Sequence, residues 1–217
     1  AGGGKPVYGV YSSFIQRTYD QLSQDLCINN NPATIVVFMG TIAGMNDETH
    51  LGFFDIPLIC NIPNMVYLAP TCKEEYFAML KWSIHQNKYP VAIRVPGASV
   101  VSDNQTYDTD YSDLNHYKLV RKGEKVAILG LGAFYSLGEA VAKRLKEETG
   151  IEATLINPRY ITGLDVAMLE DLKQSHSLVV TLEDGEIDGG FGEKIARFYG
   201  DSDMKVLTYG VRKEFAN

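Results

Sequence analysis

The chain has 217 residues, of which 45% are hydrophobic and 22% charged, and its formal net charge is −7. This composition is that of a globular protein with one large or two small domains, and the acidic balance argues against nonspecific binding to nucleic acid. Its apolar runs fall well short of the ~18 residues that span a membrane, and residues 1–5 lack the apolar core of a signal peptide.

Short apolar runs alternate with helical patterns in the first half of the chain. The runs predict strands at Val7–Tyr11, Ala33–Met39, Met65–Ala69 and Pro90–Val95. Apolar residues at helical spacing predict helices at Ser13–Cys27 and Lys73–Gln86. Nearly continuous apolar strands separated by helices are typical of a parallel sheet covered on both faces.

A polar, acidic stretch without periodicity, from Ser102 to Asp110, predicts a linker. A second alternating unit follows, with strands predicted at Lys125–Gly130, Ala153–Ile156, Leu178–Leu182 and Val206–Tyr209, and helices at Phe134–Thr149, Leu164–Lys173 and Gly192–Tyr199. We therefore expect an α/β protein with two consecutive open, mostly parallel sheets that carry helices on both faces. The two domains are expected at residues 1–116 and 117–217.

The junction between the first strand and the first helix carries aromatic rings and a cation. Tyr11 ends the strand, and Phe14 and Arg17 lie on a helix face away from the apolar stripe, at ~100° per residue. Because ligands bind beyond the carboxyl ends of parallel strands, Phe14 and Arg17 could hold a flat, electron-rich heterocycle. The alternative is that Phe14 packs against a neighbouring element while Arg17 is solvated.

A glycine-punctuated loop, Gly40–Gly52, directly follows the second predicted strand and carries Asn46 and His50. Loops in this position are where binding groups are expected. His50 could donate to a substrate carboxylate or transfer a proton near neutral pH. The alternative is a hydrogen-bonded loop histidine with no chemical role.

Two glycine-rich turns in the second half could also bind a ligand. Glu183-Asp184-Gly185 with Gly189-Gly190-Phe191-Gly192 could place a phosphate or a partner's backbone at a helix N-terminus, but a tight strand-to-helix connection is the favoured interpretation. Gly130-Leu131-Gly132 resembles the start of a dinucleotide-binding turn, yet Tyr135 occupies the position of the third glycine.

The three cysteines are Cys27, Cys60 and Cys72, an odd number without close spacing. This pattern predicts buried thiols in a reducing compartment rather than a disulfide framework or a metal site. It agrees with a cytoplasmic location.

Several strings resemble the 1-deoxy-D-xylulose-5-phosphate synthase family. The segment from Lys5 to Gln21 is similar to its hallmark "KP…IYSTFLQRAYDQ", Thr49–Asp55 to its "THxGxFD", and Cys60–Met65 to its "CIPNM". The first string is specific to this family, and the others are shared more loosely with transketolases. The resemblance covers essentially the whole chain and implies a transketolase pyrimidine-binding domain followed by a transketolase C-terminal domain.

The resemblance also implies an activity, a cofactor and partners. This family joins a two-carbon unit from pyruvate to glyceraldehyde 3-phosphate with thiamine diphosphate and Mg²⁺, which makes a precursor of isoprenoids and of thiamine. A homodimer in the cytoplasm is expected by the same analogy.

The resemblance assigns roles to residues of both constellations. Phe14 would stack on the cofactor's aminopyrimidine ring, and Tyr11 and Arg17 would line the same site. His50, with Asn46 near it, would face the substrate and the thiazolium-bound intermediate.

Other parts of the family's site have no counterpart in this chain. The activating glutamate and the domain that holds Mg²⁺ and diphosphate lie upstream in the family. We therefore expect a fragment, or the second polypeptide of a split enzyme, that is inactive alone and needs a missing N-terminal domain or subunit.

Three positions depart from the family pattern. The family places an arginine one residue before an Ala-Gly in the loop after the second strand, and Met39 stands at that position here. A second arginine follows the Tyr-Pro after a later strand of the family's sheet, and Gly97 stands at its position. Asn46 replaces an aspartate of the family's loop. Both arginines hold the acceptor's phosphate in the family, and losing two such contacts costs ~1.5–3 kcal/mol each. The acceptor of this chain is therefore left open.

Three functions remain open on the sequence. The first is a transferase of the synthase type, or a paralogue with a different aldehyde acceptor. The second is a non-catalytic dimerisation or scaffold paralogue, which the absent arginines favour. The third is a nucleotide-binding α/β module, which rests only on the partial glycine motif.

Overall fold

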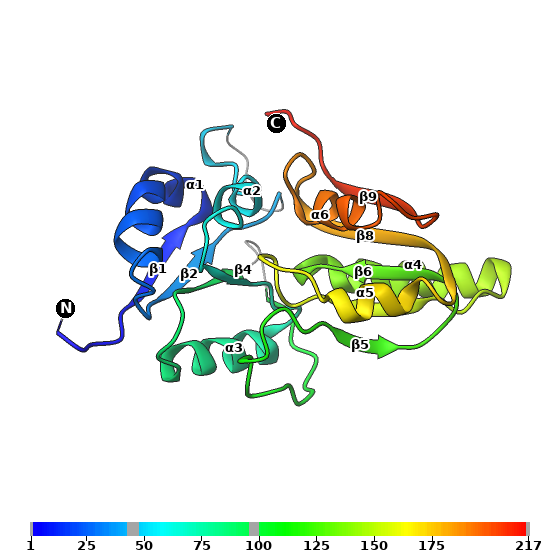
Figure 1. The fold of residues 1–217 in the computed structure, drawn as a ribbon, viewed down its shortest axis with the longest axis horizontal. Helices are drawn as coiled ribbons and strands as arrows, with labels where there is room; N and C mark the ends of the chain where they lie inside the picture. The colour runs from blue at the N-terminus through cyan, green and yellow to red at the C-terminus, as the bar shows by residue number, and fades with distance from the viewer. Residues whose placement is uncertain (1, 43–47, 96–99, 216–217) are drawn as a thin grey trace.

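The computed structural model describes residues 2–42, 48–95 and 100–215, and it contains two sheets, one in each half of the chain (Figure 1). The first sheet has the order β1-β2-β4-β3, and every pair in it is parallel. Its strands are β1 (Val7–Tyr11), β2 (Thr34–Phe38), β3 (Val66–Leu68) and β4 (Val91–Val95). All four predicted strands are confirmed, with ends that differ by at most one residue.

The helical segment after β1 changes its pitch along its length. It begins as α1 (Ser12–Ile15), continues as a 3-10 turn, η1 (Gln16–Thr18), and ends as a π-helix, η2 (Gln21–Cys27). The hydroxyl of Thr18 donates to the carbonyl of Ile15 at 2.7 Å, a side-chain bond that competes with regular helix geometry. The prediction of a helix at Ser13–Cys27 is right about the helical segment. It is wrong about the regular α-helical geometry, because the turn per residue is not a uniform ~100°.

Two further helices complete the first domain. The first, α2 (Asp55–Ile59), is a short helix that the apolar pattern does not predict, and α3 (Lys73–His85) matches the predicted helix within one residue. The side chain of Cys72 caps α3 by accepting from the backbone N–H of Glu75 at 3.4 Å.

The second sheet has the order β5-β7-β6-β8-β9. Only β5 runs antiparallel to its neighbour, so the sheet is mostly parallel as expected. Its strands are β5 (Lys118–Arg121), β6 (Lys125–Gly130), β7 (Thr154–Asn157), β8 (His176–Glu186) and β9 (Lys205–Val211). Its helical elements are η4 (Gly132–Phe134), α4 (Tyr135–Thr149), α5 (Val166–Leu172) and α6 (Phe191–Phe198).

Alternation along the strands sends side chains to two opposite faces of each sheet. In the first sheet, Val91 and Ile93 pack with Met79 and Trp82 of α3. In the second sheet, residues of β6, β7 and β8 pack against Ala142 of α4.

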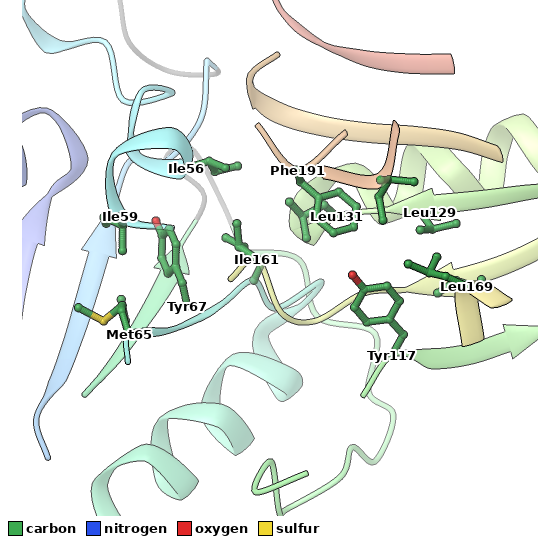
Figure 2. Packing of buried hydrophobic residues seen from close by; sticks show 14 of the residues in the cluster. Ile56, Ile59, Met65, Tyr67, Tyr117, Leu129, Leu131, Ile161, Leu169 and Phe191 are labelled. Carbon is green, nitrogen blue, oxygen red and sulfur yellow. The ribbon is translucent and has the colours of Figure 1, made fainter. Parts of the chain in front are cut away.

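The remaining faces of the two sheets share one hydrophobic core. Figure 2 shows Ile56, Ile59 and Tyr67 of the first domain in the same cluster as Leu131 and Phe191 of the second. The two domains therefore pack as one body around this core. Within the described part of the chain, no helix has the length and apolar character needed to cross a membrane.

The linker segment has no regular secondary structure where it is described, as predicted. Arg159 of the second domain holds it in place, because its Nη1 pairs with a carboxylate oxygen of Asp108 at 2.6 Å. Its Nη2 donates to the carbonyl of His116, a short way beyond the linker, at 2.7 Å. These contacts fix the linker against the second domain.

Candidate functional site

A hollow runs along the edge strand β1 and reaches the carboxyl ends of β1 and β2 in the first sheet. It has a volume of 780 Å³ and is lined by Tyr8, Gly9, Val10, Tyr11, Phe14, Phe38 and Met39. The parallel register pairs Tyr11 with Phe38, so both strands end at the same level. This is the edge at which open α/β sheets bind ligands.

Phe14 projects from α1 beside this hollow and is 41% exposed. Its ring makes edge contacts with Tyr11, at a centroid distance of 5.9 Å and an angle of 66°, and with His50, at 5.3 Å and 74°. Neither neighbour lies parallel to the Phe14 ring. The structure therefore brings together three residues from the two predicted constellations, and Phe14 does not pack into the core.

His50 ends a 3-10 turn, η3 (Glu48–His50), and is exposed. Its Nδ1 lies 2.8 Å from the hydroxyl of Thr49. Just after it, the hydroxyl of the buried Ser12 donates to the carbonyl of Gly52, which ties this loop to the start of α1. Asn46, the other residue predicted in the loop, lies outside the described residues.

Arg17 is exposed but does not line the hollow. Arg17 lies three residues, or about one helical turn, beyond Phe14, and so is farther from the strand ends. Of the three residues predicted to group at one opening, Tyr11 and Phe14 line the hollow, and the role of Arg17 in the site stays a prediction.

A buried charged cluster below the loop was not predicted. Nε of Arg94 donates to Asp55 at 2.8 Å and Nη2 donates to its other carboxylate oxygen at 3.2 Å. Nη1 of Arg94 pairs with Asp184, and the hydroxyl of Tyr67 donates to Asp55. The sequence signal was the single charge within the otherwise apolar strand Val91–Val95.

Charge and burial oppose each other in this cluster. Burial alone would lower the pKa of Arg94, but Asp184 and Asp55 outweigh it and hold this pKa above its usual value. Burial and the neighbouring Asp55 raise the pKa of Tyr67. Arg94 is therefore a cation and Tyr67 a neutral hydrogen-bond donor.

The Glu183–Gly192 segment forms the tight strand-to-helix connection that was favoured for it. The carboxylate of Glu183 accepts from the backbone N–H groups of Phe191 at 2.9 Å and Gly192 at 2.7 Å, at the start of α6. Burial raises the pKa of Glu183 to about 7, against the opposing effect of these two hydrogen bonds and of Arg94 and Lys194. A carboxylate of this chain therefore already accepts the hydrogen bonds of the backbone N–H groups at the N-terminus of α6.

The partial glycine motif is explained by packing. A Cβ at Gly130 would lie 2.7 Å from the Cα of Tyr135, so the glycine permits α4 to approach β6. Gly132 has a φ of +54°, and a Cβ there would lie 3.3 Å from Ala69 of the first domain. Both glycines serve helix and domain packing, which removes the reason for a dinucleotide-binding interpretation.

The cysteines are free thiols, with Cys27 and Cys72 buried and Cys60 partly buried. Cys72 also lies within 4.8 Å of carboxylate oxygens of Glu74 and Asp103, a grouping that could hold a cation. These carboxylates already accept hydrogen bonds within the linker, from Ser102 to Glu74 and from Tyr107 to Asp103. The grouping therefore has a structural role.

The family's two phosphate-binding arginines have no charged counterpart in this chain. Met39, at the position compared with the first arginine, lines the hollow. Gly97, at the second arginine position, lies outside the described residues.

Family models match both halves of the chain. The transketolase pyrimidine-binding domain matches residues 1–100, and the transketolase C-terminal domain matches residues 115–213. The site described above lies within the first match.

Curated relatives and a solved structure give the same picture. The chain is 34% identical over 217 residues to a 1-deoxy-D-xylulose-5-phosphate synthase of Clostridium perfringens and 36% identical over 213 residues to one of Pseudoalteromonas translucida, matches that cover 99% and 97% of this chain. It spans about a third of the length of these relatives, 35% and 33% respectively. A solved structure described as "Split gene transketolase, inactive beta4 tetramer" has the same fold, with a TM-score of 0.82 at 22% identity over 98% of this chain and 68% of that one.

Proposed function

This chain belongs to the transketolase family, and from that premise we propose that it supplies the pyrimidine-binding half of a thiamine-diphosphate site in a transferase of the 1-deoxy-D-xylulose-5-phosphate synthase type. The observation that carries this proposal is the position of Phe14, exposed at the carboxyl ends of β1 and β2 between Tyr11 and His50. The chain's curated relatives named 1-deoxy-D-xylulose-5-phosphate synthase support this class of transferase reaction.

The residues present fit a planar heterocycle. The ring of Phe14 has only edge contacts with its aromatic neighbours, so a flat ring can stack on it. Tyr11 is 53% exposed at the same opening, and Phe38 is 38% exposed across the strand pair. Thiamine diphosphate, when bound, supplies the stabilisation of carbanion character at the donor carbon.

The roles of this chain's side chains follow from their positions. Phe14 and Tyr11 hold and orient the pyrimidine ring, and they exclude water from its face. His50 presents an imidazole at the rim beside Phe14, where it can hold or move a proton of the bound substrate near neutral pH. Arg17 and Asn46 are proposed as outer contributors, Arg17 from the turn beyond Phe14.

The exposed apolar face around the hollow supports a partner domain. Tyr8 and Tyr11 of the edge strand β1 both line the hollow and are 52% and 53% exposed. Large apolar side chains grouped on one face mark an interaction surface. We propose that an N-terminal domain, or the corresponding subunit, covers this face in a homodimer and brings the Mg²⁺ and diphosphate ligands and the activating glutamate.

The acceptor is proposed to be an aldehyde other than a strongly held phosphorylated one. Met39 and Gly97 provide no cation where the family has two phosphate-binding arginines. The loss of two charge-assisted hydrogen bonds at ~1.5–3 kcal/mol each weakens binding of glyceraldehyde 3-phosphate by about two orders of magnitude or more.

A reconstitution assay tests this function. The full-length protein, or this chain with its N-terminal partner, is supplied with thiamine diphosphate, Mg²⁺ and pyruvate, and carbon dioxide release is measured with glyceraldehyde 3-phosphate, glyceraldehyde and glycolaldehyde as acceptors. We expect decarboxylation that depends on the cofactor and a KM for glyceraldehyde 3-phosphate no lower than that for glyceraldehyde. The absence of decarboxylation with every acceptor rejects the transferase.

The second candidate is a non-catalytic paralogue that retains the fold and the dimer surface. The missing arginines favour it, and so does the likeness to a split-gene transketolase whose tetramer is described as inactive. A protein that binds thiamine diphosphate in calorimetry without any turnover supports this candidate instead.

A further inference from the structure

The two domains are joined by a buried ion cluster that lies below the His50 loop. Arg94, near the end of β4, lies between Asp55 at the start of α2 and Asp184 on β8. The side chains of these three residues are 3%, 0% and 0% exposed. Nη2 of Arg94 also donates to the backbone carbonyl of Asp184 at 3.4 Å. A residue of the second domain is thus bound directly to the guanidinium that holds Asp55.

The charges in this cluster do not balance. Among the described residues that form it, one guanidinium faces two carboxylates, and Oδ2 of Asp184 is buried without a hydrogen-bond partner. Leaving a buried carboxylate oxygen unpaired costs ~1–3 kcal/mol, and more when it is charged. Stability alone therefore does not explain Asp184, since an amide or an apolar side chain of the same size avoids this cost.

The cluster is mechanically connected to the loop that carries His50. Asp55 follows His50 within the same short segment, and Gly52 between them has no room for a side chain because a Cβ there would overlap the carbonyl oxygen of Met39. A Cβ at Gly40 would lie 2.8 Å from Cγ of Arg94 and 3.0 Å from Oδ2 of Asp55. Because Gly40 before His50 packs on this ion pair and Asp55 after His50 belongs to it, we expect a shift of Arg94 to displace His50.

The second domain also packs directly on this segment. The backbone N–H of Glu186 donates to the carbonyl of Phe53 at 3.1 Å. A Cβ at Gly185 would lie 2.6 Å from Cδ1 of Ile56 on α2. The end of β8 and the start of α2 therefore form one close contact, with Asp184 at its centre.

We propose that Asp184 is a positioning residue for His50, acting through Arg94 and Asp55. Through these contacts the second domain fixes the place of the imidazole relative to Phe14, although none of its described residues lines the hollow. The effect of Asp184 on the position of His50 is inferred from the geometry alone. The consequence of that position for turnover rests on the proposed function.

The first test needs no cofactor and no activity. In the 217-residue chain, the Cε1–H signals of the four histidines are recorded by ¹H–¹³C NMR, and the His50 signal is assigned by its loss in His50→Gln. We expect Asp184→Asn to shift the His50 signal while the His85 and His116 signals stay in place. The matched control is Asp188→Asn, because Asp188 lies four residues after Asp184, just beyond β8, but pairs with Lys213 at the surface, with its side chain 54% exposed.

An unchanged His50 signal in a folded Asp184→Asn protein overturns the proposal. If Asp184→Asn does not fold, Asp184→Glu replaces it, because it keeps the charge and adds one methylene that displaces Arg94. An unchanged His50 signal in that variant overturns the proposal in the same way.

The second test is a double-mutant cycle in the cofactor-loaded full-length protein. Asp184→Asn is expected to lower kcat by about tenfold with a change in the KM for pyruvate below about twofold, because a displacement of ~1 Å can cost up to a hundredfold. In the His50→Gln background, Asp184→Asn should lower kcat by less than about twofold. Additive effects in the two backgrounds overturn the route through His50.

The two tests separate this inference from the proposed function. A wild-type protein without turnover rejects the function but leaves the NMR result to decide on the positioning link.

Discussion

The imidazole of His50 meets the ring of Phe14 edge to face, with centroids 5.3 Å apart and ring planes at 74°. The two residues follow different strands, β1 and β2, which the parallel register brings to the same edge of the sheet. The ring proposed to stack on the cofactor and the ring proposed to transfer a proton therefore lie in contact at one edge of the sheet. This relationship gives each residue a separate, measurable role.

Replacing Phe14 by alanine should weaken thiamine diphosphate binding by about 10- to 100-fold, since stacking and ring burial together contribute ~1.5–3 kcal/mol. Calorimetry with Mg²⁺ and the full-length protein measures this change. Stability should stay within ~1 kcal/mol, because Phe14 is 41% exposed. Phe77→Ala, which removes a 56% exposed ring from α3, is the control and should leave the affinity unchanged. Equal affinities of the two variants contradict the stacking role.

Replacing His50 by glutamine should lower kcat by about 100-fold or more, because loss of a positioned proton donor typically costs 10²–10⁴-fold. Steady-state kinetics with pyruvate measures kcat, and calorimetry should show cofactor affinity within about threefold of the wild type. His85→Gln is the control, because His85 is an exposed histidine whose Nδ1 lies 2.7 Å from the carbonyl of Lys81, away from the hollow. A His50→Gln protein with normal turnover rules out the proton-transfer role.

Much of this fold was predictable because hydrophobic periodicity reports burial. Both faces of β2, β4 and β6 are covered, so these strands are continuous apolar runs whose ends are easy to locate. The strand β5 was missed because its burial is partial, and Leu119 and Val120 are 47% exposed each. The helix α2 was missed because five residues are too few to establish a period.

The site was predictable only where it coincides with a local pattern. Tyr11 and Phe14 lie where a predicted strand meets a predicted helix, and this junction is visible in the sequence. The change from α-helical to 3-10 geometry after Phe14 was not predictable, because it depends on side-chain bonds such as Thr18 to Ile15. The cluster of Arg94 and Asp184 joins distant parts of the chain, and no local pattern brings them together.

The buried carboxyl of Glu183 should make stability depend on pH. Burial raises its pKa from an ordinary 4.5 to about 7, so the folded protein binds its proton more tightly than the unfolded chain does. This contribution is fully present below pH ~4.5 and is lost as the pH rises through about 7, a change of ~3 kcal/mol. Urea unfolding at several pH values should show this loss in the wild type and not in Glu183→Gln.

The control for this pH effect is Glu193→Gln. It removes an exposed carboxylate on α6 that accepts a hydrogen bond from the backbone N–H of Gly189 at 2.7 Å. Its pH dependence should follow that of the wild type. If Glu183→Gln and the wild type have parallel stability curves from pH 4 to 8, Glu183 does not titrate in this range.

Replacing Arg94 by methionine should lower the free energy of unfolding by about 3–5 kcal/mol, because it leaves two buried carboxylates without their shared cation. Urea unfolding followed by the fluorescence of the single tryptophan, Trp82, measures this loss. Arg144→Met is the matched control, because Arg144 is a 78% exposed side chain paired with Glu148 one helical turn away. It should cost no more than ~0.5 kcal/mol.

The same cluster gives a stricter form of this prediction. If the loss in Arg94→Met arises from the uncompensated carboxylates, adding Asp55→Asn and Asp184→Asn should recover a large part of it, since neutral amides cost less to bury than unpaired charges. If it arises from lost packing of the arginine side chain, the two added substitutions leave it unchanged or increase it. Recovery of stability without recovery of the wild-type His50 NMR signal would separate the two roles of the cluster, because neutral side chains can satisfy the core without restoring the charged contact that holds the loop.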